Sequence, residues 1–146
     1  MRAESVIVWR ATRERGVALP IYNLSPLFQP QFVAHSAAAA LAFATPGLPT
    51  TVPTGVSYQI GVMRCVNIDT VPVTLKLWRV PSGSTAIDVN VVVPVTVQVP
   101  VATQTFPHFD VTVLWGAVLA PGDSIWGLAG VASMLTISGD GLVITQ

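Results

Sequence analysis

The feature that most constrains this chain is a long segment without charge. From Gly16 to Met63, 48 consecutive positions, there is no Asp, Glu, Lys or Arg. Such a segment cannot easily cover itself with a solvated surface, so we expect it to be buried in a membrane, in its own fold, or against other chains. The whole chain is also poor in charge, at 10% of residues, where soluble domains average about 25%.

A membrane is the weakest of these three explanations. Six prolines interrupt the uncharged segment, so no window reaches the roughly 20 apolar, helix-compatible residues that a membrane span needs. The first fifteen residues hold six of the fourteen charges and lack the long apolar core of a secretory signal. We therefore predict an extended, Pro-rich N-terminal arm over residues 1–55, which lies on partner surfaces, and no membrane partner.

Composition and periodicity favour β structure in the remainder. Val, Thr and Ile make up 46 of the 146 residues, and these β-branched types suit a pleated, half-buried surface. Residues 88–102 carry Val at every odd position, which predicts one or two strands with a single buried face. Residues 71–80 share this period, and Gly139–Gly141 predicts the turn of a final hairpin. The prediction is an all-β fold, with an antiparallel β-sandwich or jelly roll in residues 56–146.

The tripeptide "GDS" at 122–124 raises the possibility of a hydrolase, because it carries the nucleophilic serine in GDSL-type enzymes. Those enzymes place the serine early in an α/β sheet and a histidine near the C-terminus, whereas here no histidine follows Ser124. A convergent triad would need His108 and a carboxylate such as Asp110 to reach Ser124. The proline and glycine of "PGDS" are instead typical of a tight turn. We predict no catalytic residues and no enzyme activity.

Metal, cofactor and nucleic-acid sites are not expected either. His35 and His108 are far apart in sequence and lack a nearby carboxylate pair. Cys65 is the single cysteine and sits in an apolar run, which favours a buried, inert thiol. The formal net charge is zero and the basic residues are dispersed, so no groove for nucleic acid is predicted.

Interfaces with other proteins are therefore the expected functional surfaces. The segment "SVIVWRA", residues 5–11, has the pattern of a strand that could add to a neighbour's sheet edge. Trp78 shares its parity with Thr74 and Lys76, which points it outward, and an outward Trp can anchor an interface. The predicted interface residues are Val6, Ile7, Val8, Trp9, Phe28, Phe32, Phe43 and Trp78.

Two stretches, "VTLKLWRVPSGSTAIDVN" and "LAPGDSIWGLAG", carry a family resemblance. Their patterns are V-T-L-x-L-x-x-V-P-S-G, A-x-D-x-N and L-x-P-G-D-x-I-x-x-x-A, and with them residues 56–145 resemble small β-sandwich virion proteins of tailed bacteriophages. The matching positions are Val73, Thr74, Leu75, Leu77, Val80, Pro81, Ser82, Gly83, Ala86, Asp88, Asn90, Leu119, Pro121, Gly122, Asp123, Ile125 and Ala129. These are strand and turn residues, so the resemblance carries over no active site.

The resemblance implies a non-enzymatic structural component of the virion. The first expectation is a capsid decoration (cement) protein, a homo-oligomer and most simply a trimer. It would bind where subunits of the major capsid protein meet, on the capsid surface, after assembly in the host cytoplasm. The uncharged arm suits such a permanent interface. The alternatives are a tail or fibre adaptor or receptor-binding module and, last, a hydrolase that uses Ser124.

Overall fold

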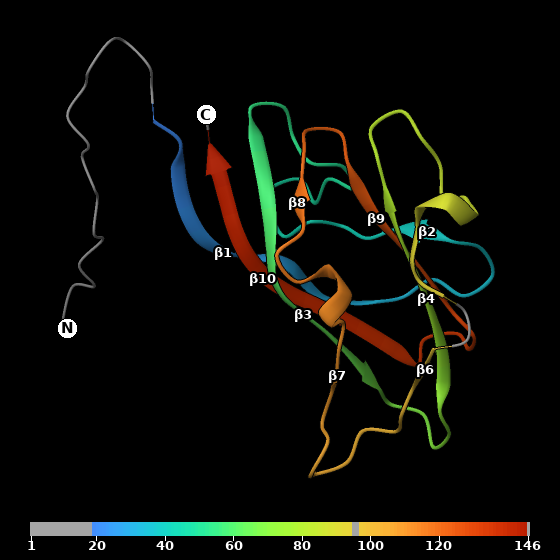
Figure 1. Ribbon diagram of the computed structural model, residues 1–146. Coiled ribbons are helices and arrows are strands. Elements are labelled where there is room, and N and C mark those ends of the chain that lie inside the picture. The colour runs from blue at the N-terminus through green and yellow to red at the C-terminus, as the bar shows by residue number, and fades with distance from the viewer. Residues whose placement is uncertain (1–18, 95–96, 146) are drawn as a thin grey trace, which may run out of the picture.

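The computed structural model describes residues 19–94 and 97–145, which form two antiparallel sheets packed face to face (Figure 1). The predicted all-β sandwich is confirmed, while the jelly-roll connectivity stays a prediction. Helical structure in the described residues consists of two 3-10 turns, η1 (Asp88–Asn90) and η2 (Thr112–Leu114). Within these ranges, no helix has the length and apolar character that crossing a membrane requires.

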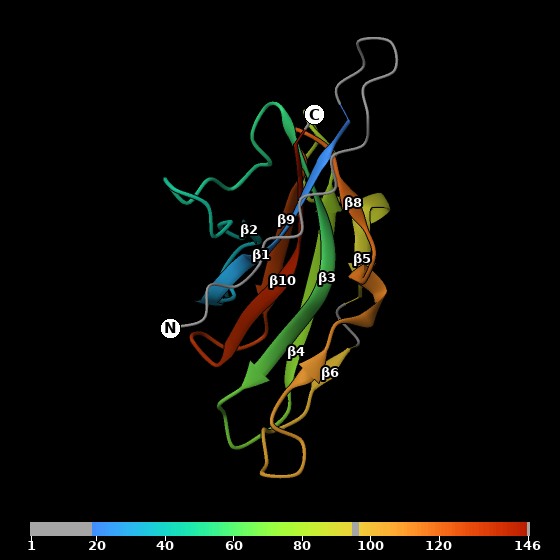
Figure 2. The same cartoon turned by 90° about the vertical axis from the view of Figure 1, so that its left-hand side faces the viewer.

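Each sheet contains five strands. Sheet A has the order β1 (Ile21–Phe32), β10 (Leu135–Thr145), β3 (Val56–Asn67) and β7 (Phe109–Asp110), and β8 (Val118–Leu119) pairs with the other end of β3. Sheet B has the order β2 (Ala39–Ala40), β9 (Ser124–Ala129), β4 (Val73–Val80) and β5 (Val91–Val93), and β6 (Gln98–Val99) also pairs with β4. Figure 2 looks onto sheet A, with β4 and β9 of sheet B behind it.

The core lies between the sheets and is filled by one face of each strand, as a period of two requires. Phe43 lies between two other aromatic side chains, with ring centroids 4.8 Å from Phe28 and 4.9 Å from Tyr58. Cys65 is fully buried, and burial raises the pKa of its thiol to about 12. The predicted burial of this thiol is confirmed, while its inertness stays a prediction.

Residues 21–32 belong to the sandwich rather than to a separate arm. β1 pairs with β10 from Ile21–Thr145 to Phe32–Thr136, with two irregularities in register. Pro26 and Pro30 are compatible with this strand because an edge strand leaves half of its N–H groups unpaired, where a proline removes nothing from the ladder. A domain boundary at residue 55 is therefore not present in the described part. Residues 1–18 lie outside the described residues.

The segment predicted as a hairpin turn, Gly139–Gly141, lies within a single strand. β10 runs through it, and the register with β3 slips by one residue between Asp140 and Gly141. A Cβ at Gly141 would overlap the carbonyl oxygen of Gln59. The glycines therefore allow two backbones to approach closely at a β-bulge, and they do not form a turn.

The Val-rich segment 88–102 forms less strand than its period predicts. It contains η1, then β5 and β6, and residues 95–96 between them are outside the described part. Val89 is the most exposed large apolar residue of those described, at 84%. The reason is local: the side-chain amide of Asn90 donates to Thr85 O (2.9 Å) and to Ser84 Oγ (3.2 Å), which fixes a turn where alternation alone predicts a strand.

Candidate functional site

The N-terminal half of β1 carries apolar side chains that the fold does not bury. Ile21 and Tyr22 are each about 60% exposed, and Leu24 is 81% exposed. Leu19, just before the strand, is also exposed. A soluble domain tolerates single exposed apolar residues, but a cluster of them marks an interaction surface.

The strand register aligns two of these residues with others on the outer surface of sheet A. Leu24 pairs with Leu142, which pairs with Gln59, which pairs with Val118, so one row crosses four strands. A second row contains Tyr22, Ile144 and Ser57. Directly paired residues share a face of the sheet, and Val143, between Leu142 and Ile144, packs against the core, so both rows point outward. We call the residues Tyr22, Leu24, Val118, Leu142 and Ile144 the apolar face.

The apolar face contains no charge in either row, and it borders a hollow. The hollow has a volume of about 470 Å³ and is lined in part by Leu24, Pro26, Val62 and Gly141. It lies at the glycine bulge, where Gly61 and Gly141 present no side chain. The exposed Asp140 also lines the hollow. The surface is therefore apolar with a polar margin, which is the usual composition of a protein-binding site.

Backbone groups of β1 beside the apolar face have no partner among the residues that the structure describes. Ile60 donates to Ala117 O (2.9 Å) and accepts from Gly116 N, so its backbone points toward β8 and away from β10. Hydrogen bonding alternates along an antiparallel pair, so the neighbouring residue, Gln59, directs its backbone groups toward β10 and bonds to Leu142. The backbone N–H and C=O of Leu142 therefore point toward β3, and those of Leu24, which lies opposite Leu142, point away from β10. The same alternation turns the N–H and C=O of Tyr22 outward. β1 is the last strand of sheet A among the described residues, so within those residues this edge is open.

The C-terminal half of the same edge is covered. The side-chain amide of Gln31 donates to Ala42 O (2.8 Å) and accepts from Ala42 N (2.9 Å), as a strand residue would. Ala44 N donates to Leu27 O (2.7 Å). We call these contacts the Gln31 clamp. Covering an edge prevents uncontrolled pairing, so strand addition along β1 is confined to its N-terminal half.

The predicted interface residues have different places in the structure. Val6, Ile7, Val8 and Trp9 lie outside the described residues. Phe28 and Phe43 are core residues, at 2% and 0% exposure, and do not reach the surface of this chain. Phe32 is exposed, at the end of β1 away from the apolar face.

Trp78 points outward, as its parity predicts, but it is covered. It pairs with Trp126 across β4 and β9, is 5% exposed and lies outside the core cluster. The Lys76 ammonium sits 4.9 Å from its ring centroid and 3.4 Å from Asp88 Oδ1. Trp78 is therefore not an exposed anchor in this chain. Sequence reasoning missed Tyr22 and Leu24, although the alternation in "LPIYNLS" was the available signal.

The residues of the hydrolase hypothesis are used elsewhere. Ser124 is buried, and its hydroxyl oxygen accepts a hydrogen bond from Trp126 Nε1 (2.9 Å). His108 Nε2 lies 3.3 Å from Asp110 Oδ1, on the side of sheet A, whereas Ser124 begins β9 of sheet B. The predicted turn at "PGDS" is confirmed, because Asp123 N donates to Ala120 O (3.0 Å) and Gly122 has a φ of 88°.

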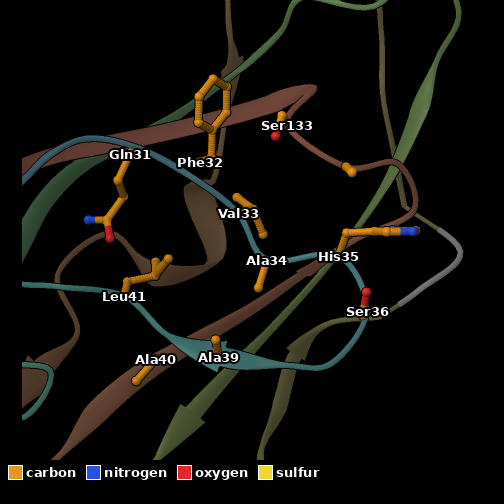
Figure 3. A pocket seen from close by; sticks show the side chains of 11 residues that line it. Gln31, Phe32, Val33, Ala34, His35, Ser36, Ala39, Ala40, Leu41 and Ser133 are labelled. Atoms are coloured by element: carbon orange, nitrogen blue, oxygen red, sulfur yellow. The ribbon is translucent and has the colours of Figure 1, made fainter.

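A second hollow, of about 320 Å³, lies where β1 ends and the chain turns toward β2 (Figure 3). Its lining includes His35, Ser36 and Ser133 but no carboxylate. His35 Nδ1 is 3.3 Å from Ala129 O, and its ring points away from the other lining residues (Figure 3). Among the described residues, no group of three or more His, Cys, Asp or Glu side chains could hold a metal ion.

Comparisons with known proteins add no assignment: neither a protein-family model, nor a curated protein, nor a solved structure matches this chain.

Proposed function

We propose that this chain is a non-enzymatic structural protein that binds other protein surfaces through the apolar face, and that it decorates a bacteriophage capsid. The carrying observation is the pair of uncharged rows that crosses sheet A beside the open edge of β1. The virion setting is supported by the resemblance of residues 56–145 to small virion β-sandwiches. Its partners would be the major capsid protein and further copies of itself, on the capsid surface.

The mechanism would be additive burial. Burying one large apolar side chain contributes roughly 1.5–3 kcal/mol, and part of this is offset by the loss of freedom on association. A single apolar face therefore gives a weak contact. Repeated over several copies of an oligomer on a shell, the same contact becomes tight through avidity. A capsid offers such a repeated surface, and a cement protein stabilises it by holding neighbouring subunits together.

A tail or fibre module is the second candidate, and a specific observation favours it. Phe106 is 69% exposed and Trp115 is 42% exposed, on the connections that flank β7 and η2. Exposed aromatic side chains on loops suit recognition of a receptor.

The test is co-sedimentation of the full-length chain with empty shells of the virus that encodes it. We expect Leu24→Lys to weaken shell binding by about tenfold or more, because it places a charge on the most exposed residue of the apolar face. Val89→Lys is the matched control, since Val89 is equally exposed but lies in η1 of the other layer. If both variants bind shells like the parent, the apolar face is not the docking surface. If the parent binds tails and not shells, the fibre alternative replaces decoration.

A further inference from the structure

We propose that the open half of β1 pairs with the same half of β1 in a second copy, antiparallel and about a two-fold axis at Asn23. The two copies of sheet A would then form one continuous sheet. This inference concerns the contact between two copies and needs no shell, so it does not rest on the proposed function.

The pattern of unpaired backbone groups is complementary to itself. Tyr22 and Leu24 each present an outward N–H and C=O, with Asn23 between them turned toward β10. A two-fold axis at Asn23 brings Leu24 of one copy opposite Tyr22 of the other. Each of these pairs can exchange two hydrogen bonds, so every outward donor of the open half finds an acceptor.

Proline sets both ends of this short ladder. In the same register, Pro20 of one copy stands opposite Pro26 of the other. Neither residue has an N–H group, so no donor is left unpaired where the ladder stops. Beyond Pro26, the carbonyl of Leu27 is already occupied by the Gln31 clamp. The open part of the edge is therefore as long as the proposed ladder, which runs between Pro20 and Pro26.

The side chains agree with the same register. Tyr22 would lie beside Leu24 of the second copy on the outer surface, so the two apolar faces would merge. A two-fold axis brings identical residues together, which makes any charge near it repulsive. Residues 16–25 contain no charge, so this obstacle does not arise. A second copy is therefore favoured over a charged strand of another protein.

A two-fold contact predicts a dimer, whereas the family resemblance implies a trimer. Sedimentation equilibrium of the full-length chain without shells distinguishes them. We expect a dimer whose dissociation constant rises about tenfold or more in Leu24→Lys and is unchanged in Val89→Lys. A parent chain that stays monomeric at tens of micromolar would overturn the proposal.

Cysteine cross-linking tests the register. Asn23 faces its own copy across the axis as a non-hydrogen-bonded pair, where Cα atoms lie about 4.5 Å apart, within reach of a disulfide. Under mild oxidation we expect Asn23→Cys to give a covalent dimer on a non-reducing gel. Ile21→Cys is the matched control: Ile21 is also exposed and lies on the same strand, but in this register it faces Ser25 of the second copy and not itself. The native Cys65 is buried and does not interfere.

Each outcome bears on one proposal. Equal cross-linking of both cysteine variants, or a trimer without the Asn23→Cys cross-link, overturns the two-fold pairing. A cross-linked dimer that ignores shells leaves this inference standing and removes capsid decoration. A monomer that binds shells overturns the two-fold pairing and supports capsid decoration.

Discussion

The indole N–H of Trp126 donates a hydrogen bond of 2.9 Å to the hydroxyl oxygen of Ser124, two residues earlier on β9. An indole N–H is only a donor and cannot take a proton from a serine. The hydroxyl that sequence pattern marks as a possible nucleophile is therefore the acceptor that satisfies a half-buried tryptophan.

Replacing that serine tests its structural role. We expect Ser124→Ala to lower the free energy of unfolding by about 1–2 kcal/mol, because the indole N–H loses its partner. Trp126→Phe removes the donor, so the double variant should cost less than the sum of the two single changes. Urea unfolding of the four proteins measures this coupling. Any hydrolysis of a p-nitrophenyl ester that Ser124→Ala abolishes would instead support the enzyme.

Asp123 joins two turns, and removing it should be costly. Its carboxylate is buried and accepts from Ser82 N (3.0 Å) and from Ala120 N (3.0 Å), which ties the turn after β4 to the turn before β9. We expect Asp123→Ala to lower the free energy of unfolding by about 2–4 kcal/mol. Asp140→Ala, at an exposed residue, should change the free energy of unfolding by less than about 0.5 kcal/mol. A cost for Asp123→Ala no larger than this control would contradict the role assigned to Asp123.

Cys65 should react only when the chain unfolds. Burial raises its pKa from 9.0 to about 12, so at pH 8 the thiolate fraction is about 1000-fold lower in the folded chain. The stabilising contribution of the buried, neutral Cys65 thiol is fully present below pH 9. It is lost as the pH rises from 9 toward 12, because the unfolded chain then loses the thiol proton more readily than the folded chain. We expect labelling by iodoacetamide at pH 8 to follow global unfolding in urea. Fast labelling of the native chain would contradict the buried position.

The glycine bulge between β3 and β10 should tolerate no side chain at Gly141. A Cβ at Gly141 would overlap the backbone oxygen of Gln59, so we expect Gly141→Ala to lower the free energy of unfolding by more than about 3 kcal/mol. Gly47→Ala is the control: its φ of 86° strains a side chain, but no atom lies within 4 Å of the new Cβ, so the cost should be about 1–2 kcal/mol. Comparable losses in the two variants would mean that close approach at the bulge is unimportant.

The sandwich itself could be predicted because its signal is periodic. Residues 73–77 alternate in and out as their sequence alternates. The errors came where another interaction overrides that period. At residues 88–90, the side chain of an asparagine fixes a turn. At Gly139–Gly141, the glycine pattern is typical of a turn, but the glycines instead allow two strands to approach closely.

The candidate site was harder to predict. An uncharged segment with regular prolines suggested an arm, because proline usually interrupts strands. Edge strands are the exception, since they tolerate a missing N–H on their open side. Whether Phe28 is core and Leu24 surface depends on the slip in register between Pro26 and Phe28, and sequence alternation does not reveal such a slip. Pairing between residues over a hundred positions apart decides which apolar residues face outward.

The Gln31 clamp has a consequence for how far such a sheet can grow. A strand that is open along its whole length can template filaments, because each added chain offers a fresh edge. Here the clamp leaves one short opening along β1 in the described part of the chain, and the reciprocal contact that we propose between two chains would close both of these openings at once. Growth at this edge would then end at a pair, so a few hydrogen bonds with Ala42 and Ala44 would separate a finite assembly from a fibrous one.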